Sequence, residues 1–305
     1  MFLLSCSNRN RTVSEFDPKE LVKEEILGSG KSGTVYKAKW RNIDVAWKEF
    51  KSEAIDEYLI RDFCQEVSVL CKLAHPNIVR MIGFVLEPRL SLALEFCPGG
   101  TLEKALAVHA EERSFEWNLV VKIGLDISRA LCYLHSQQPA IIHNDLKPDN
   151  VMVVNLNPDY STTACVKLID FGFSIATTDG KRKDIKSFGT MFDAIMNFYC
   201  DENHPSARAA ILPTLSRPMA HVHIPEVLKR IVSGCKVKYT AERLEYKFSK
   251  LWKRMEIGSQ CKRALAQGFN EALNPITTVS VFKGASKNVV LDLIKNTDQD
   301  SIDKE

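Results

Sequence analysis

The segment that decides the fold is Ile142-His143-Asn144-Asp145-Leu146-Lys147-Pro148-Asp149-Asn150, and the tripeptide Asp170-Phe171-Gly172 begins twenty residues after Asn150. The first stretch gathers carboxylates, a lysine and an amide within a few positions. The tripeptide adds a third carboxylate, followed by an aromatic residue and a glycine. Chance does not supply two such specified motifs in this order.

A glycine-rich element lies upstream, at Gly28-Ser29-Gly30-Lys31-Ser32-Gly33-Thr34-Val35. Its G-x-G-x-x-G-x-V spacing is weak evidence alone, because dinucleotide-binding folds use the same glycines where a helix opens. Here Thr34-Val35-Tyr36 continue as a strand, which is typical of a flap of backbone amides over the phosphates of ATP. The triplet Gly30-Lys31-Ser32 also suggests a P-loop, but that motif requires a glycine where Glu25 stands.

Lys48 follows the glycine element, at the end of the apolar run Val45-Ala46-Trp47. A lysine on a strand is often simply a solvated surface residue. Its position after a glycine loop favours instead a lysine that neutralises the α- and β-phosphates, and such a lysine needs an anion to keep it charged and aimed. Glu66, on the polar flank of the next predicted helix, is the expected partner.

The first hundred residues favour a sheet with one helix. Strand-forming residues, interrupted by glycines and by Arg41-Asn42, predict an antiparallel meander over residues 21–50. Apolar positions that step by three and four predict a helix within 54–74, which ends before His75-Pro76. Two more strands are expected around 78–86 and 90–96. Pro98-Gly99-Gly100 then breaks the pattern, and we place a lobe boundary there.

Beyond this break the chain is mainly helical. Apolar residues from Trp117 to Leu134 step by three and four, which predicts an amphipathic helix. Short apolar runs predict buried strands at 151–154 and 166–169, and further helices are expected near 184–199, 225–235 and 241–255. The polar first eighteen residues, 1–18, are predicted to be a flexible leader, with order beginning near Glu20. Residues 257–305 are predicted to be a partly ordered tail.

Together these motifs resemble the eukaryotic protein kinase family, whose catalytic loop and magnesium-binding tripeptide correspond to residues 142–150 and 170–172. The resemblance runs from about Leu21 to Met255. It implies an α+β fold with two lobes. Residues 19–98 would form a small N-lobe with an antiparallel sheet and one helix, and residues 99–256 a larger, mainly helical C-lobe.

Several details narrow the resemblance. Lys147, two residues after Asp145, is similar to the pattern of serine/threonine kinases. The context of Trp47-Lys48 and the segments His75-Pro-Asn-Ile and Ser187-Phe-Gly189 look closest to the tyrosine-kinase-like group. The resemblance therefore implies transfer of the γ-phosphoryl group of Mg-ATP to serine or threonine hydroxyls of proteins.

The resemblance also implies a role for each matching residue. Asp145 would accept the proton of the attacking hydroxyl, and Lys147 would steady the charge on the transferring phosphoryl group. Asn150 and Asp170 would hold Mg²⁺ ions that bridge the phosphates of ATP. Two further sets of contacts are expected. The phosphates would be contacted by Lys48, with its partner Glu66, and by Gly28, Gly30 and Gly33. Adenine would be contacted by Val35, Ala46, Met152 and the backbone of Glu95 to Cys97.

Two departures from the family concern regulation and substrate binding. Asn144 stands where most members have an arginine that pairs with a phosphorylated activation loop, and a neutral amide does this poorly. Only eleven residues, Phe173 to Lys183, separate Gly172 from Asp184, and no A-P-E triplet occurs among them. In the family this segment is far longer and forms the floor on which a substrate peptide lies, so its loss removes an alignment on which proximity catalysis depends.

Arg243 resembles the helical arginine that family members pair with the glutamate of the absent triplet. A buried arginine without its carboxylate is costly, so we expect that another acid replaces the partner or that Arg243 turns to solvent. An ordinary surface arginine is the alternative. The shortening itself is either genuine or the product of a gene model that skipped coding sequence.

Composition adds limits of its own. The chain has 305 residues, with 41 basic and 38 acidic side chains and a formal net charge of +3, so neither nucleic acid nor a membrane is implied as a partner. Nine dispersed cysteines without a C-x-x-C pair suggest reduced thiols and a cytoplasmic protein. The start Met1-Phe-Leu-Leu-Ser-Cys6 lacks the features of a secretory signal.

Two functions therefore stay open from the sequence. The first is an active serine/threonine kinase that uses ATP and Mg²⁺. The second is an ATP-binding pseudokinase that acts as a scaffold or allosteric partner, because the platform for a peptide substrate is missing. Neither the protein substrate nor the scaffold partner is identified by the sequence.

Overall fold

The structure, a computed structural model, describes residues 7–8, 11–12, 14–30, 33–51, 57–106, 117–155, 165–177, 179–200, 226–253 and 255. Two compact units divide the chain, Met1–Trp252 and Lys253–Glu305. Lys31, Ser32, Thr178 and the predicted tail lie outside the described residues. Within the described part, no helix has both the length and the apolar character that crossing a membrane requires.

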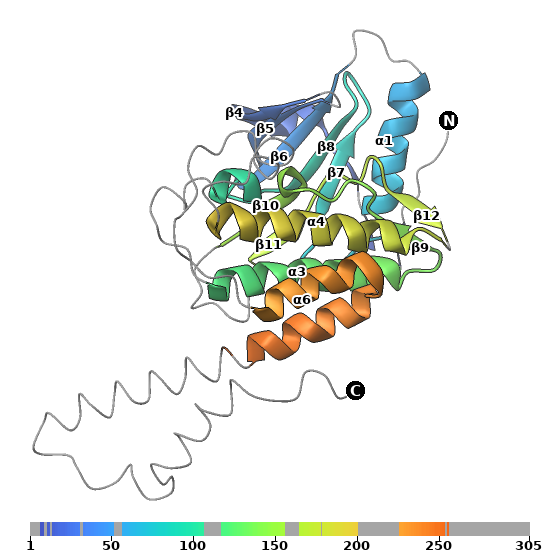
Figure 1. Ribbon diagram of the computed structural model, residues 1–305. Helices are drawn as coiled ribbons and strands as arrows, with labels where there is room; N and C mark the ends of the chain where they lie inside the picture. Colours follow the sequence, from blue (N-terminus) through green and yellow to red (C-terminus); the bar gives the residue numbers. More distant parts are fainter. Residues whose placement is uncertain are drawn as a thin grey trace, which may run out of the picture. The chain divides into compact units, whose positions relative to one another are not determined.

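A six-stranded sheet forms the first lobe, with the strand order β3-β7-β8-β6-β5-β4 (Figure 1). Its pairs are antiparallel except for β3, which runs parallel to β7. The predicted meander is confirmed: at its centre, Arg41 and Asn42 turn β5 into β6 with positive φ angles of 47° and 66°, as a tight two-residue hairpin requires. The strands are β3 (Ser14–Glu15), β4 (Leu21–Ser29), β5 (Gly33–Trp40), β6 (Ile43–Phe50), β7 (Met81–Val85) and β8 (Ser91–Glu95).

The end of the predicted leader is part of this lobe, which corrects the expectation that order begins near Glu20. Phe16 is buried and stacks on Trp40 with ring centroids 4.2 Å apart. Its ring occupies the space beside Gly83, where an added Cβ would lie 2.5 Å from a ring carbon. A 3-10 turn, Pro18–Glu20, then leads into β4. Farther upstream, β1 (Ser7–Asn8) pairs with β2 (Arg11–Thr12).

In the described part of this lobe, the α-helix is α1, Glu57–Leu70, which lies beside β7 and β8 (Figure 1). It is anchored by Phe63, whose ring meets Phe50 and Phe84 edge-on at 5.5 and 6.3 Å. The same helix face buries Glu66 and Val67. Packing of α1 through its apolar stripe therefore carries a carboxylate toward the sheet.

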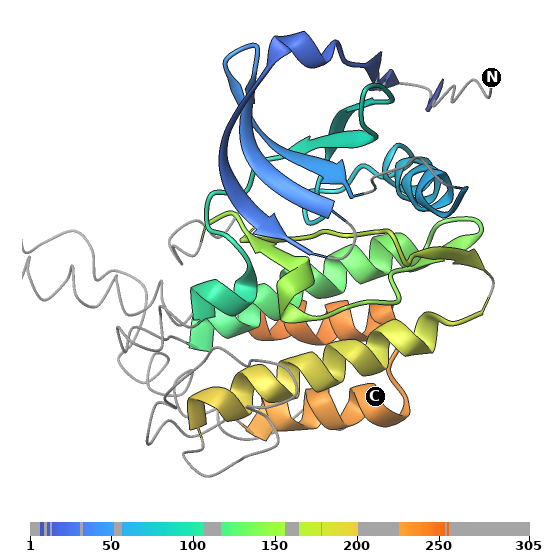
Figure 2. The same cartoon turned by 90° about the horizontal axis from the view of Figure 1, so that it is seen from above.

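The second lobe is mainly helical, as predicted, so the structure confirms an α+β fold with two lobes. Figures 1 and 2 show α4 and α6 side by side. Gly124 allows α3 to approach Phe248, since a Cβ there would lie 2.3 Å from the phenyl ring. The helices are α3 (Trp117–His135), α4 (Lys181–Cys200) and α6 (Glu226–Val237), with further helical residues at 102–106 and 241–253.

Two short strand pairs in this lobe frame the two sequence motifs, residues 142–150 and 170–172. Strand β9, Ala140–Ile142, precedes the first motif and pairs with β12, Ile175–Thr177, which follows the second. Strand β10, Val151–Val153, follows the first motif and pairs with β11, Val166–Leu168, which precedes the second. Pairing of strands on both sides thus brings two motifs that are distant in sequence to one place.

Candidate active site

A buried ion pair joins the sheet to α1. Lys48 Nζ donates to Glu66 Oε1 at 2.9 Å and to Glu66 Oε2 at 2.7 Å, and the two side chains are 8% and 2% exposed. Burial alone would lower the pKa of Lys48, but Glu66 and Asp170 outweigh it and hold the pKa above its ordinary value. Lys48 is therefore charged, as a lysine that contacts phosphates must be. The structure brings together the pair that the sequence predicted.

Asp170 lies at the same point, with Oδ1 3.5 Å from Lys48 Nζ. Its φ of 61° falls in the left-handed region, which non-glycine residues seldom adopt. The next residue, Phe171, is fully buried and packs against His143 with ring centroids 5.0 Å apart. The tripeptide thus buries its aromatic ring while the carboxylate before it faces the lysine.

Asp145, Lys147 and Asn150 form one hydrogen-bonded group. Lys147 Nζ donates to Asp145 Oδ2 at 2.7 Å, and Asn150 Nδ2 donates to the same oxygen at 2.9 Å and to the Asp145 carbonyl at 2.7 Å. Burial alone would raise the pKa of Asp145, but these bonds outweigh it and the pKa lies below its ordinary value. Asp145 is therefore ionised at neutral pH and can accept a hydrogen bond from a hydroxyl.

Asp184 of α4 holds the backbone of residues 142–150, which we call the catalytic segment after the role predicted for Asp145. Its Oδ2 accepts from His143 N at 2.9 Å, and its Oδ1 accepts from Asn144 N at 3.0 Å. His135 Nε2 lies 2.9 Å from the same Oδ2, and both side chains are buried. Although only eleven residues connect Gly172 to Asp184, that short connection still delivers α4 to the catalytic segment.

His143 connects the two motifs. Burial lowers its pKa, so the imidazole is neutral. Since a carbonyl only accepts, Nε2 must carry the proton, and it donates to Ile169 O at 3.0 Å. Ile169 immediately precedes Asp170, so one neutral histidine fixes the catalytic segment against the residue before the tripeptide.

A pocket of about 330 Å³ opens between the glycine element, β8 and Asp170. Apolar side chains form two of its walls, with Val35 and Ala46 from the sheet and Met152 from β10. Cys97 is buried in the segment after β8, and burial raises the pKa of its thiol to about 11. Cys97 therefore acts as a small packing residue rather than as a thiolate.

Most predicted nucleotide contacts line this pocket: Gly28, Val35, Ala46, Lys48, Glu66, Glu95, Cys97, Asn150, Met152 and Asp170. The predicted residues that do not line it are Gly30, Gly33, Asp145 and Lys147. The carboxylate of Glu95 is engaged by Lys167 Nζ at 3.0 Å and by Arg80 N at 3.2 Å. The Glu95 carboxylate is thus already engaged by two donors within the protein.

Other lining residues were missed by sequence reasoning. Leu27, Leu94 and Ile169 each adjoin a predicted residue, so sequence adjacency was the available signal. Thr101 and Lys104 also line the pocket, and they come from the helical stretch at 102–106 and the residue before it. The apolar residues of that stretch show no strong periodicity, so only the folding of the chain after β8 brings it to the site.

Gly33 is required where the glycine element meets β6. A Cβ on Gly33 would lie 2.2 Å from the carbonyl oxygen of Glu49, whereas a Cβ on Gly28 or Gly30 would meet nothing within 4 Å. Gly30 N donates to Gly33 O at 2.9 Å, which closes the turn. Gly28 and Gly30 therefore leave open space above the pocket, while Gly33 permits close approach of two backbones.

The donor set fits a magnesium ion. Asp170 offers a carboxylate, and Asn150, whose Nδ2 already donates to Asp145, offers its amide oxygen. Both residues line the pocket. Mg²⁺ prefers oxygen ligands and is usually held by one or two carboxylates together with substrate phosphates.

The structure also places Asn144 and Arg243, the two residues that the sequence singled out for their unusual context. The side chain of Asn144 donates through Nδ2 to the Phe173 carbonyl at 3.0 Å. Arg243 is exposed, and its guanidinium lies 5.8 Å from the ring centroid of Tyr246.

The fold and the site together define a protein with the bilobal kinase fold. Comparison with known proteins agrees, because residues 21–193 match the family model described as the protein kinase domain. The chain belongs to the protein kinase family. Members of this family use ATP and Mg²⁺ for phosphoryl transfer.

Three relatives illustrate the similarity. The chain is 38% identical over 157 residues to a putative serine/threonine-protein kinase/receptor R826 of Acanthamoeba polyphaga mimivirus, 36% over 182 residues to the probable serine/threonine-protein kinase pats1 of Dictyostelium discoideum, and 40% over 164 residues to the serine/threonine-protein kinase VIK of Arabidopsis thaliana. These alignments cover 51%, 56% and 52% of this chain, but only 9%, 6% and 36% of the respective relatives.

Proposed function

We propose that the chain is an ATP-dependent serine/threonine kinase that transfers the γ-phosphoryl group of Mg-ATP to protein hydroxyls. The observation that carries the proposal is the assembled Lys48–Glu66 pair, with Asp170 3.5 Å from the lysine. Asp145 in the catalytic segment is ionised and can therefore accept a proton from the attacking hydroxyl. These are the groups that phosphoryl transfer needs for positioning and for neutralising charge.

Each residue then has a defined task. Lys48, kept charged by Glu66, contacts the α- and β-phosphates. Asp170 and Asn150 would hold Mg²⁺, which would supply positive charge to neutralise the phosphates. Asp145 orients the attacking hydroxyl and accepts its proton, and Lys147 stabilises charge on the transferring group.

The choice of serine and threonine as acceptors rests on two supports. Lys147 lies two residues after Asp145, which is similar to the pattern of serine/threonine kinases. The three relatives above carry the name serine/threonine-protein kinase.

The direct test is transfer of labelled phosphate from Mg-ATP to the chain itself and to generic basic proteins. Asp145→Asn is the matched control, because it keeps the shape of the side chain and removes the base. Loss of a general base lowers turnover by roughly 10²–10⁴-fold. Equal incorporation by the wild type and by the Asp145→Asn variant would overturn the proposal.

A second candidate is favoured by the short connection after Gly172. Strand β12 leads through Gly180, with φ of 101°, directly into α4 at Lys181. This leaves little chain to form a floor for a peptide substrate. An ATP-binding pseudokinase, acting as a scaffold or allosteric partner, would bind nucleotide without turnover.

Two measurements distinguish the active kinase from the pseudokinase: thermal stabilisation by Mg-ATP and transfer of phosphate. Both predict that Mg-ATP raises the unfolding temperature, because a ligand that binds only the folded state stabilises it. Both also predict that Lys48→Met or Asp170→Asn weakens this stabilisation. Stabilisation without phosphate transfer would favour the pseudokinase, and absence of stabilisation would contradict both.

A further inference from the structure

Three hydrogen bonds converge on Phe173 and Ser174, the two residues that follow Gly172. Asn144 Nδ2 donates to Phe173 O at 3.0 Å. Gln65 Nε2 donates to Ser174 O at 2.6 Å, and Ser174 Oγ donates to His143 O at 3.2 Å. We name this arrangement the amide clamp, formed by Gln65, Asn144 and Ser174.

The clamp touches each part of the nucleotide site. Gln65 immediately precedes Glu66 on α1, and Asn144 immediately precedes Asp145 in the catalytic segment. The residues that they hold follow Asp170 within four positions. Each residue of the clamp is therefore close in sequence to a carboxylate of the site, which is Glu66, Asp145 or Asp170. A shift of one of these carboxylates would strain the hydrogen bonds of the clamp.

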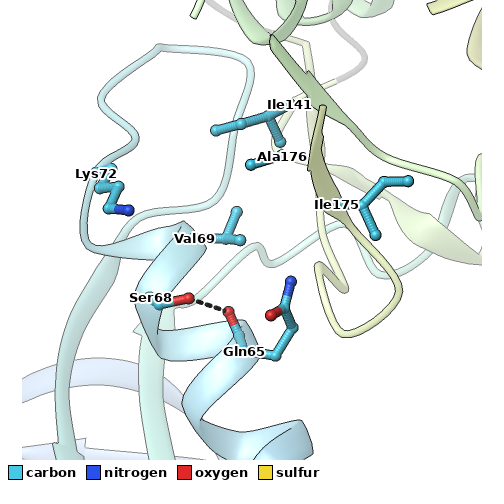
Figure 3. A pocket seen from close by; sticks show the side chains of 7 residues that line it. All are labelled: Gln65, Ser68, Val69, Lys72, Ile141, Ile175 and Ala176. Carbon is cyan, nitrogen blue, oxygen red and sulfur yellow. Dashed lines mark hydrogen bonds between the residues drawn. The ribbon is translucent and has the colours of Figure 1, made fainter. Parts of the chain in front are cut away.

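Gln65 reaches across a gap in the packing. It lies on a stripe of α1 with Ser68, Val69 and Lys72, and this stripe faces β9 and β12 across a recess of about 340 Å³ (Figure 3). Figure 3 shows the side chain of Gln65 pointing from the helix toward the strand that carries Ile175. Because the recess separates α1 from β9 and β12 there, the hydrogen bond from Gln65 to Ser174 connects α1 to the residues that follow Gly172.

Asn144 suits its own position in the clamp. Its φ of 70° is left-handed, a conformation that asparagine tolerates better than most residues. Its amide donates to a backbone carbonyl, which is a neutral acceptor. The side chain of Asn144 therefore makes its hydrogen bond without an anionic partner, whereas an arginine at this position would pair with a phosphate group.

We propose that Gln65 and Asn144 are positioning residues that hold the segment after Gly172 against α1 and the catalytic segment without any phosphate group on that segment. The nucleotide site is thus assembled by amides that are always present. The proposal rests on the proposed function only for its effect on nucleotide affinity; the hydrogen bonds of the clamp lie within the chain itself.

Two variants of the full chain test the clamp. Gln65→Leu removes the donor while keeping a similar volume and good helix propensity. Asn144→Asp keeps the shape and the tolerance for a left-handed backbone, but sets a carboxylate against the Phe173 carbonyl. Gln137→Leu is the matched control, because Gln137 Nε2 also donates to a backbone carbonyl, that of Tyr133 at 2.9 Å, in the turn after α3.

The first readout is hydrogen exchange of the unliganded protein across residues 171–177. One net hydrogen bond is worth a factor of roughly three to ten in a local equilibrium, so exchange in this segment should accelerate by about that factor in Gln65→Leu and Asn144→Asp. Gln137→Leu should leave it unchanged. No acceleration, or equal acceleration in the control, would overturn the proposal.

The second readout is the Kd of Mg-ATP, measured calorimetrically before and after phosphatase treatment. We expect the Kd of the wild type to be the same in both states, and the Kd of the two clamp variants to rise by up to roughly tenfold, as the competent fraction falls. A wild-type Kd that rises after phosphatase treatment would refute independence from phosphate. If the wild type binds no Mg-ATP but exchange follows the expected pattern, the clamp stands and the proposed function fails.

Discussion

Replacing Lys48 by methionine gives the sharpest test of how the site is built. The substitution keeps most of the side-chain volume and removes the charge that faces Glu66. The side chain of Glu66 is only 2% exposed and cannot turn to water without moving α1. The variant therefore leaves a buried carboxylate without its cation.

The structure sets the expected magnitude. Removing one partner of a buried ion pair costs about 3–5 kcal/mol, whereas replacing both partners by apolar residues of similar size is close to neutral. We therefore expect Lys48→Met to lower the free energy of unfolding by about 3–5 kcal/mol. The double variant Lys48→Met/Glu66→Met should recover most of that loss.

The loss should also depend on pH. Burial raises the pKa of Glu66 above 4.5, its ordinary value, and in the single variant no lysine opposes this. Above pH 4.5 the folded variant then binds more protons than the unfolded chain, so its stability falls as the pH rises through the raised pKa. The penalty relative to the wild type should be smallest near pH 4.5 and larger at neutral pH.

Urea unfolding followed by tryptophan fluorescence measures these differences, because Trp47 is buried beside Lys48 in β6. The reasoning is refuted if the double variant is as unstable as Lys48→Met, since the penalty would then not come from an unpaired Glu66. A single-variant penalty below about 1 kcal/mol, the size of an exposed pair, would refute it as well.

Four further substitutions, one of them a matched control, test other parts of the structure. Phe16→Ala should cost about 3 kcal/mol in urea unfolding, because its ring is buried on Trp40; a negligible cost would show that the leader packs weakly after all. Gly33→Ala should cost about 1–3 kcal/mol in thermal unfolding, since its Cβ would lie 2.2 Å from the β6 backbone, and Gly30→Ala should shift stability by less than about 0.5 kcal/mol; equal effects would contradict the geometry. Arg243→Ala should change stability by less than about 0.5 kcal/mol, because the residue is exposed, and a larger loss would reveal a buried carboxylate partner.

Much of the site could be predicted because its residues belong to compact motifs. Asp145, Lys147 and Asn150 lie within six positions, so a short stretch of backbone suffices to bring them together. Periodicity placed α1 and α3 for a similar reason, since a stripe of apolar residues must face the core wherever the helix packs. The roles assigned to these residues stay proposals.

Predictions from local sequence were wrong or incomplete where contacts between distant residues determine the structure. The polar composition of residues 1–18 favoured a flexible leader, yet one phenylalanine, Phe16, finds Trp40 and the open face of Gly83. Likewise, nothing in the spacing of Thr101 and Lys104 connects them to the pocket that they line. In both cases the partner is far away in the sequence, and only the packed chain brings it close.

The sequence by itself determined the family, the order of the motifs and the identity of the charged groups, because these depend on residue type and short spacing. It also revealed Asn144 and the eleven-residue connection as departures. Only the tertiary structure showed that Asp184 still reaches the catalytic segment, that the guanidinium of Arg243 lies over the ring of Tyr246, and that Gln65 bonds to Ser174 across 109 positions of sequence. Such contacts depend on how α1, β12 and α4 pack against the two motifs, and spacing along a chain carries no record of that packing.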